Sequence, residues 1–340
     1  MRIPKFLPEN GTIGFVAPSY GAATDPYKSA FLHADEVFRA AGYRTVTGPN
    51  VFRSDGIGIS ASPEECGREL TDFYTSPLND AVISVGGGEL MCEDLPVVDF
   101  DAVKRAPAKW YMGYSDNTNF TFLLPTLCDT AAVYGPCAGA FGMVPLHQSV
   151  NDAFALITGK RSVFQGYDLW EKEGLKSEEN PLEPYNVTEE SHPRFESWDG
   201  GPIFGRFIGG CLDCLVNLCG TRFDRAKDFA EKYREDGIIW FLEACDLNVF
   251  SIRRALWELK EAGWFSHVKA FLIGRPVVMG QSIMGLDQYS AVTGILSEFN
   301  VPILMDLDIG HLPPAMPIVS GGCGTVTKEG PERISIRFQL

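Results

Sequence analysis

Short apolar segments alternate with amphipathic helical patterns along the first part of the chain, and this alternation restricts the possible folds more than any other feature. The expected strands are 12–18, 44–47, 80–85, 109–114 and 131–134. Helices are predicted over 26–41, from its apolar spacing, and over 116–127. Another begins at Ser62, because Pro63 and Glu65 supply a first-turn proline and a capping-box glutamate. Strands and helices that alternate with short connections predict a parallel, doubly wound sheet.

The character of the sequence changes over 165–201, which is rich in glutamate and proline and shows no hydrophobic periodicity. A segment this polar cannot fill a core, so we expect a linker or a long loop. The sequence therefore predicts an N-terminal α/β domain over 1–164, an acidic linker or loop over 165–201, and a C-terminal α/β domain over 202–340.

The alternation of strands and helices resumes after this acidic segment. The expected strands are 203–208, 238–242, 268–273 and 301–304. An amphipathic helix is expected at 248–262. Near the C-terminus, 324–327 and 334–338 form a predicted hairpin around the turn Glu329-Gly330-Pro331.

Charge and composition exclude several classes of function. The chain has 44 acidic and 29 basic residues, a net charge of −15, and such a field repels nucleic-acid phosphates and anionic lipids. No uninterrupted apolar run reaches the roughly 18 residues of a membrane span, and the N-terminal residues lack the apolar centre of a signal peptide. The nine cysteines are scattered, which suggests reduced thiols. We expect a cytoplasmic protein.

The stretch 110–117 (WYMGYSDN) is the strongest candidate for a catalytic turn. An apolar strand runs into Gly113-Tyr114-Ser115, and a helix begins at once. A serine at such a turn is lifted out of the sheet, and it lies near backbone N–H groups that favour a developing negative charge. Ser115 is therefore either a nucleophile or only a helix cap. The second glycine of a full nucleophile elbow is missing.

A serine nucleophile needs a base, and the chain has five histidines. The other four lie in a helix, a loop, the acidic segment and a position before a strand: His33, His147, His192 and His267. His311 follows an apolar strand and Gly310, and prolines come soon after it. Open α/β sheets place their sites at such strand ends, so His311 is the preferred base, although a buried structural histidine is the alternative.

A carboxylate is required to orient the imidazole. The apolar strand 238–242 runs directly into Glu243, and a charged group there needs a partner or water. Glu243 is therefore either the third catalytic residue or a carboxylate that caps a helix.

Two further motifs are candidate binding sites. Gly86-Gly87-Gly88 follows the third strand and lets backbone N–H groups approach a ligand, as an oxyanion hole or a phosphate site requires. Cys211-Leu212-Asp213-Cys214 has the form of half a metal site, but no second pair or histidine stands at a zinc-like spacing. We interpret the two cysteines as small core residues.

Taken together, these motifs resemble the LD-carboxypeptidase family of serine peptidases, which includes murein tetrapeptide carboxypeptidases and microcin C immunity peptidases. The resemblance runs nearly the whole length and depends on the order and spacing of six segments. They are Gly14–Ser19, Gly86–Gly88, Gly113–Asp116, Gly205–Gly210, Phe241–Glu243 and Ile309–His311.

The resemblance implies a triad of Ser115, His311 and Glu243, with an oxyanion site formed by backbone N–H groups at Gly87, Gly88 and Asp116. It implies an amidotransferase-like parallel-sheet domain at the N-terminus and a swivelling-type α/β domain at the C-terminus, with the site between them. It also implies a homodimer that needs no cofactor and no metal.

Two positions depart from the usual family pattern. Cys211 stands where an asparagine is usual, and Leu312 stands where a glycine is usual. The asparagine lies near the substrate in relatives, so the substrate of this chain can differ. Neither departure removes a member of the expected triad.

The function that this resemblance implies is an LD-carboxypeptidase that acts on muropeptide tetrapeptides in cell-wall recycling. The first alternative is an immunity-type peptidase that cleaves aminoacyl-nucleotide amides, in which Trp170, Tyr185 or Trp198 would stack on a base. The second is a non-catalytic sensor that binds a muropeptide or peptide. An α/β-hydrolase esterase shares the chain order of the triad but lacks support from the glycine pattern.

Overall fold

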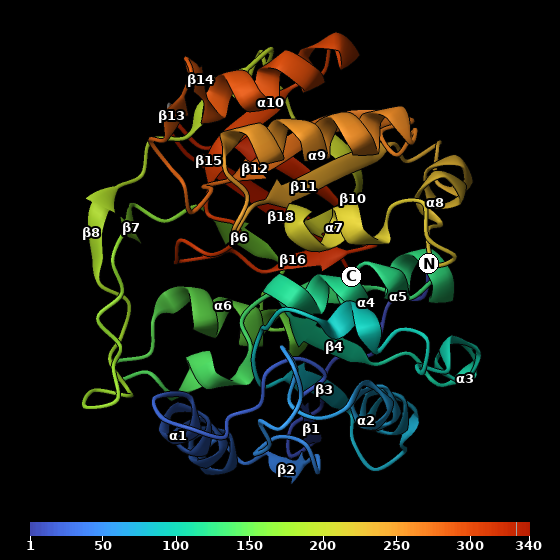
Figure 1. Cartoon of the computed structure of the whole chain (residues 1–340), viewed down its shortest axis with the longest axis vertical. Coiled ribbons are helices and arrows are strands. Elements are labelled where there is room, and N and C mark those ends of the chain that lie inside the picture. Colours follow the sequence, from blue (N-terminus) through green and yellow to red (C-terminus); the bar gives the residue numbers. More distant parts are fainter. Residues whose placement is uncertain (331) are drawn as a thin grey trace.

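Two β-sheets flanked by helices make up the chain, and the computed structural model describes residues 1–330 and 332–340 (Figure 1). The first sheet has the order β16-β5-β4-β3-β1-β2. Its strands are β1 (Thr12–Val16), β2 (Arg44–Thr47), β3 (Ala81–Ser84), β4 (Trp110–Gly113), β5 (Ala132–Tyr134) and β16 (Ile318–Ser320). The pairings among β1 to β5 are all parallel, which confirms the predicted parallel sheet. β16 is antiparallel to β5.

Helices cover both faces of this sheet because its strands alternate between two apolar faces. In β1, Ile13 and Phe15 pack in the cluster that contains Phe31 and Phe38 of α1. Val16 packs in the cluster on the opposite face, which includes residues of α2. The helical elements of this half are α1 (Tyr27–Ala40), α2 (Pro63–Thr75), η1 (Met91–Glu93), α3 (Phe100–Arg105), η2 (Ser115–Asn117), α4 (Thr118–Thr121), α5 (Leu123–Cys128), η3 (Ala138–Gly142) and α6 (Gln148–Ile157).

The predicted start of α2 is confirmed in detail, whereas the helix predicted over 116–127 is interrupted. Ser62 accepts a hydrogen bond from the Glu65 backbone and completes a capping box. The segment after Ser115 instead forms a 3₁₀ turn and two short helices that meet at Phe122. Pro125 has no N–H to donate to the carbonyl four residues earlier, which accounts for the break.

The second sheet has the order β6-β18-β17-β10-β11-β12-β15-β9. Its strands are β6 (Val163–Gln165), β9 (Arg194–Glu196), β10 (Ile203–Cys211), β11 (Ile238–Glu243), β12 (Val268–Gly274), β15 (Ile303–Leu307), β17 (Cys323–Lys328) and β18 (Ile334–Gln339). The four strands β10, β11, β12 and β15 are parallel. β17 and β18 form the predicted hairpin, and Pro331 in its expected turn lies outside the described residues.

Helices in the second half of the chain pack on this sheet through a separate apolar cluster (Figure 1). They are α7 (Leu212–Leu218), α8 (Ala226–Lys232), α9 (Val249–Glu261), α10 (Gln288–Leu296) and η4 (Ser297–Phe299), with the small hairpin β13 (Ser282–Ile283) and β14 (Leu286–Asp287) before α10. The predicted helix at 248–262 is confirmed as α9. None of the helices in the described part of the chain combines the length and hydropathy needed to span a bilayer.

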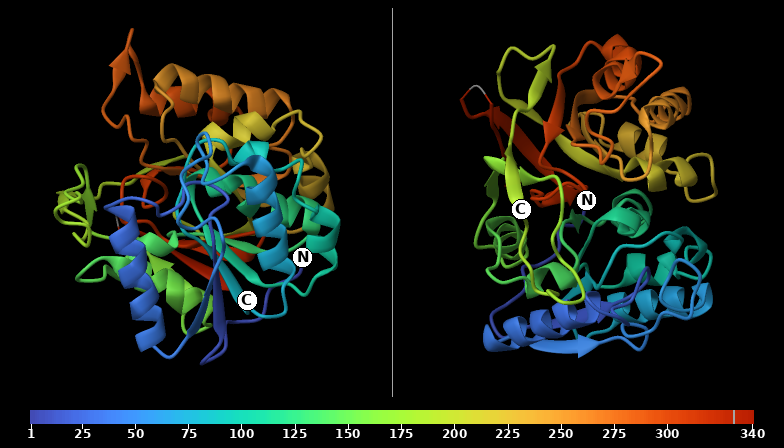
Figure 2. Two further views of the ribbon diagram at one scale, coloured as in Figure 1. Left: turned by 60° about the horizontal axis from the view of Figure 1, so that its bottom comes forward. Right: turned by 60° about the vertical axis from the view of Figure 1, so that its left-hand side comes forward.

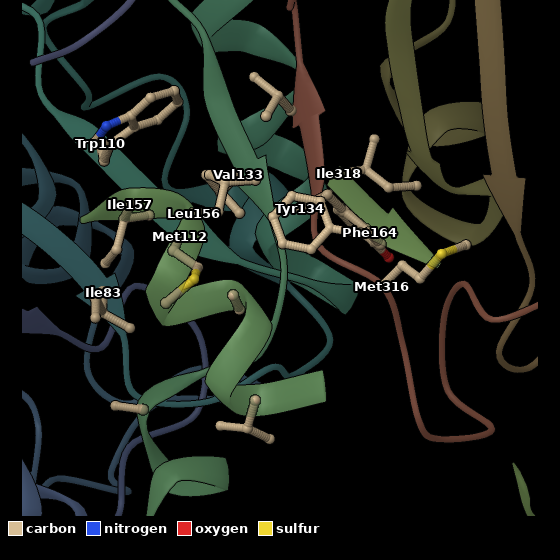
Figure 3. Packing of buried hydrophobic residues seen from close by; sticks show 14 of the residues in the cluster. Ile83, Trp110, Met112, Val133, Tyr134, Leu156, Ile157, Phe164, Met316 and Ile318 are labelled. Carbon is tan, nitrogen blue, oxygen red and sulfur yellow. The ribbon is translucent and has the colours of Figure 1, made fainter. Parts of the chain in front are cut away.

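The two halves exchange strands, which the sequence does not predict. β16 comes from the C-terminal half and joins the first sheet, and β6 precedes the acidic segment and joins the second. The largest apolar cluster therefore continues from one sheet to the other. Figure 3 shows this continuity, with Met316 and Ile318 beside Val133, Tyr134 and Phe164.

The acidic segment 165–201 is more ordered than the predicted linker. It contains β7 (Leu169–Glu171) paired with β8 (Val187–Glu190), and its β9 forms an edge of the second sheet beside β15. The β7–β8 ribbon extends alongside both halves in the right-hand view of Figure 2. Its strands were missed because their residues are mostly polar, so the alternation that marks a half-buried strand is absent.

A buried ion pair attaches this segment to the loop after β15. The guanidinium of Arg275 pairs with Asp308, and the side chains of both residues are nearly inaccessible to solvent. Asp308 also accepts a hydrogen bond from the Tyr167 backbone, and Arg275 lies over the ring of Trp170. The loop that leads to His311 is therefore fixed by contacts from the acidic segment.

Candidate active site

Ser115 lies at the turn between β4 and α4, in a conformation that few serines adopt. Its φ is +63°, in the left-handed region that non-glycine residues occupy only when their surroundings impose it. Asn117 supplies part of that constraint, because its side-chain amide donates to the carbonyls of Tyr114 and Gly86. The Ser115 backbone N–H donates to the hydroxyl of Tyr134 over 3.2 Å. The turn presents the serine hydroxyl beyond the end of the sheet.

His311 joins Ser115 to Glu243. Its Nε2 lies 2.8 Å from Ser115 Oγ, and its Nδ1 lies 2.8 Å from Glu243 Oε2. Because an ionised carboxylate can only accept, Nδ1 carries a proton and Nε2 is the atom directed at the serine. Gly310 has a φ of +101°, and a Cβ there would lie 2.6 Å from Glu243 Oε2. Glycine at this position therefore allows the histidine to reach the carboxylate.

Glu243 ends β11 and is only 1% exposed. Its Oε2 accepts from His311, and its Oε1 accepts from the hydroxyl of Tyr134 over 2.5 Å. A buried carboxylate is costly unless each oxygen is hydrogen-bonded, and here both oxygens have a donor. Glu243 is thus part of a hydrogen-bonded chain that leads to Ser115.

The electrostatics of the pair favour the ionised carboxylate beside a charged imidazole. Burial would raise the pKa of Glu243, but the charge of His311 and hydrogen bonds from His311 and Tyr134 hold it below its usual value. Burial would lower the pKa of His311, but Glu243 and the neighbouring Cys245 raise it well above 6.5. A base can accept a proton only in its unprotonated form, so activity that depends on His311 should increase as pH rises through this raised pKa.

The remaining histidines lie elsewhere. The structure places each in a local contact: His33 with the Gly142 carbonyl, His147 as the N-cap of α6, His192 with Glu190 and Glu332, and His267 with Glu231. Of the histidines, His311 alone contacts Ser115.

The glycine loop after β3 approaches the serine at one position. A Cβ on Gly87 would lie 3.0 Å from Ser115 Cβ and 3.1 Å from its Oγ, so Gly87 is the glycine that borders the hydroxyl. A Cβ on Gly88 would instead meet Ser19 Oγ at 2.1 Å, which places Gly88 against the loop after β1. The backbone N–H of Gly87 has no hydrogen-bond partner among the residues that the structure describes.

Asp116 directs its carboxylate away from the serine hydroxyl, into a buried network. It accepts hydrogen bonds from Ser19 Oγ at 2.6 Å, from the Met91 backbone at 2.9 Å and from the Asn119 amide at 3.0 Å. This network fixes the turn that carries Ser115. Only the backbone N–H of Asp116 is therefore free to donate to a group that reacts at Ser115.

A cavity of about 400 Å³ opens beside the serine–histidine pair. Gly87, Tyr114, Tyr134 and His311 form one side of it, and the acidic segment contributes Glu171, Lys176, Glu183 and Tyr185. Cys211 is not part of this lining; it is 2% exposed, and its backbone N–H donates to Thr118 Oγ1. Cys211, the residue expected to alter substrate contact, is therefore buried outside the lining of this cavity.

Sequence reasoning missed Tyr134, which holds Glu243 and the Ser115 backbone together. The available signal was its position at the carboxyl end of a buried strand next to the one that precedes Ser115. The pKa of Tyr134 is raised well above 10 by burial and by Glu243, so its hydroxyl remains a donor.

Replacing Tyr134 with phenylalanine should lower the free energy of unfolding by about 1.5–3 kcal/mol, because a buried carboxylate loses a donor. The Glu243 carboxylate, with one donor fewer, should then attract the proton of the His311 imidazole more strongly. The acid limb of kcat/KM should move to higher pH and kcat should fall. Urea unfolding and a pH–rate profile measure these changes. Tyr114→Phe is the matched control, because Tyr114 lines the same cavity and its ring packs on His311, but its hydroxyl gives Glu243 no hydrogen bond among the described residues. An unchanged pH limb would show that Tyr134 does not act on the pair.

Comparison with known proteins gives a consistent set of relatives. The LD-carboxypeptidase N-terminal domain matches residues 13–135, and the LD-carboxypeptidase C-terminal domain matches residues 204–326. The microcin C7 self-immunity protein MccF of Escherichia coli is 26% identical over 317 residues, which covers 91% of this chain and 88% of that protein.

Solved structures share the fold over the full length. MccF in complex with aspartyl sulfamoyl adenosine superimposes with a TM-score of 0.81 at 23% identity, covering 100% of this chain and 99% of that one. An MccF-like protein from Streptococcus pneumoniae in complex with AMP gives a TM-score of 0.79 at 22% identity, covering 97% and 98%.

Proposed function

Because the chain belongs to the LD-carboxypeptidase family of serine peptidase-type hydrolases, we propose that it cleaves an amide bond with a triad of Ser115, His311 and Glu243. The observation that carries the proposal is the unbroken path from Ser115 Oγ through the imidazole to Glu243, with 2.8 Å at both junctions. Hydrogen-bond reach between nucleophile, base and orienting group is the geometric requirement of this chemistry.

The reaction follows from these contacts. His311 Nε2 takes the proton of Ser115 as Oγ attacks the carbonyl carbon of the amide, and Glu243 stabilises the imidazolium that results. The backbone N–H groups of Gly87 and Asp116 donate to the oxyanion of the tetrahedral intermediate. The intermediate collapses when the imidazolium gives its proton to the leaving amine. Water, deprotonated by the same nitrogen, then releases the acyl group from the serine.

We propose a muropeptide tetrapeptide with a terminal D-alanine as the leading substrate. A carboxypeptidase must bind a terminal carboxylate, and Lys176 is a cation in the wall of the cavity. Burial lowers the pKa of Lys176, and it forms no salt bridge with any residue that the structure describes. A partly desolvated ammonium group without a salt bridge is suited to pair with a substrate carboxylate.

A second candidate is the amide of an aminoacyl nucleotide, favoured by the similarity to MccF and by one aromatic side chain. Of the three aromatic residues predicted to stack on a base, Tyr185 lines the cavity. Trp170 is 6% exposed and lies over Arg275, and Trp198 packs on Phe195. A nucleobase would therefore stack on Tyr185.

Incubation of the protein with each substrate, followed by mass spectrometry of the products, separates the candidates. Loss of one alanine from the tetrapeptide supports the carboxypeptidase, and release of the free amino acid from the nucleotide amide supports the second activity. Ser115→Ala serves as the control in both reactions. If neither substrate is cleaved and a fluorophosphonate fails to label Ser115, the chain is a binding protein and the proposal is wrong.

A further inference from the structure

The fold supplies the partners that the Cys211–Cys214 motif lacks in the sequence. β10 and β11 are parallel neighbours, and their register sets Cys211 directly beside Glu243. β15 lies beyond β12 on the side of β11 that faces away from β10, and the loop after it brings His311 to the same place. Three residue types that ligate transition metals, remote from one another in the chain, therefore meet at the ends of these strands.

The donor atoms of these residues lie close enough to share one ion. One ligand atom each from Cys211, Glu243 and His311 lies within 4.8 Å of the other two, and no other such group occurs among the residues that the structure describes. Donor atoms around a tetrahedral zinc are roughly 3–4 Å apart, given bond lengths of about 2.0–2.3 Å. Movements of about 1 Å would therefore bring the three donor atoms to the spacing of zinc ligands.

The chemistry of the three ligands selects for thiophilic divalent cations. A thiolate, an imidazole and a carboxylate suit zinc and cobalt, whereas magnesium and calcium prefer oxygen ligands. A water molecule fills the fourth position, as in zinc sites with three protein ligands. His311 borders the cavity, so an ion can enter from that side.

We propose that Cys211, Glu243 and His311 bind one thiophilic divalent cation such as Zn²⁺. The bound ion inhibits the hydrolase. Cys211 binds as the thiolate, and its proton passes to solvent. Both nitrogens of His311 are engaged in the triad, one with Glu243 and one with Ser115. Coordination of the imidazole and of Glu243 must replace at least one of these bonds, so the metal-bound protein cannot activate the serine.

Cobalt(II) provides a test that does not depend on a substrate. The reduced, chelator-treated full-length protein is titrated with CoCl₂, and the expected result is one ion per chain with a thiolate-to-cobalt absorption band. Cys211→Ser and Cys211→Asn should each remove that band. Their affinity for Zn²⁺ should fall by at least roughly 10–100-fold. That is the loss caused by changing a residue that only contacts a metal ligand, and Cys211 is itself a ligand. Cys219→Ser, at the C-terminal end of α7, is the matched control and should leave binding unchanged.

Inhibition is read by labelling of Ser115 with a fluorophosphonate in the presence and absence of ZnCl₂. Labelling should fall with zinc in the wild-type protein and in Cys219→Ser, and should be restored by EDTA. In the Cys211 variants, zinc should leave each variant's own metal-free labelling unchanged. Absence of saturable cobalt binding, or a band that persists in both Cys211 variants, overturns the inference. If the wild-type serine is unlabelled without metal, the proposed function fails, but the cobalt spectrum still decides the metal site.

Discussion

Replacement of Ser115 by alanine is expected to lower kcat for amide hydrolysis by about a millionfold, the scale of loss when a serine protease loses its nucleophile. The hydroxyl is the only atom removed, and its contact is the hydrogen bond to His311 Nε2. The turn, its positive φ and the bond to Tyr134 all belong to the backbone or to other side chains. The free energy of unfolding should therefore change by less than about 1.5 kcal/mol.

Steady-state kinetics with the cleaved substrate and thermal unfolding of the same preparation measure the two effects. Ser149→Ala is the matched control, because Ser149 lines the cavity that His311 also borders, but hydrogen-bonds to His147. Ser149→Ala should retain most of the activity. Wild-type rates in Ser115→Ala, after contamination is excluded by active-site labelling, would remove Ser115 from the mechanism.

Replacement of Glu243 by glutamine is expected to lower kcat by roughly 10⁴-fold, as in triads where the orienting carboxylate becomes an amide. The amide can donate to Nδ1 and so hold the imidazole in the tautomer whose proton faces the serine. The negative charge that stabilises the imidazolium is lost as well. The buried environment of Glu243 makes both effects strong, because water cannot replace the missing charge.

The pH dependence of the same variant provides a second readout. In the wild-type protein the pKa of His311 is raised well above 6.5 by Glu243, and the base acts only when Nε2 is unprotonated. Activity should therefore rise with pH through that raised pKa. Without the carboxylate charge the pKa falls, so the acid limb of the residual activity in Glu243→Gln should move to lower pH. Equal rates and an unmoved limb would mean that Glu243 is structural.

The strands at the centre of both sheets are predicted well because they are buried on both faces and bounded by glycine, proline and cap residues. The same logic selected Ser115, Glu243 and His311, since each polar side chain lies at the end of an apolar strand or in the turn that follows it. The structure brings these three side chains together, and their catalytic roles remain proposals. Tyr134 also ends a buried strand, but this position alone does not distinguish it from an ordinary tyrosine of the core.

Two other features depend on contacts between segments that are remote in the chain. β16 has three residues, too few for periodicity to identify a strand, and only its pairing with β5 defines it. In the proposed metal site, Glu243 comes from the strand beside Cys211, and His311 comes from a loop about a hundred residues further along the chain. No rule based on spacing in the sequence can find such a group. Register between β10 and β11 creates this proximity.

The crossing of β16 into the first sheet has a consequence for how the molecule can be engineered. His311 lies on the stretch that leaves β15 in one sheet and enters β16 in the other. The imidazole is thus tethered at both ends, once to each half. A gene split at the acidic segment would yield two fragments. The N-terminal fragment would lack β16, the edge strand of the first sheet, and the C-terminal fragment would carry β16 without its partner β5. The two fragments would restore activity together only if β16 of the second fragment pairs with β5 of the first. Restored hydrolysis would therefore report correct reassembly.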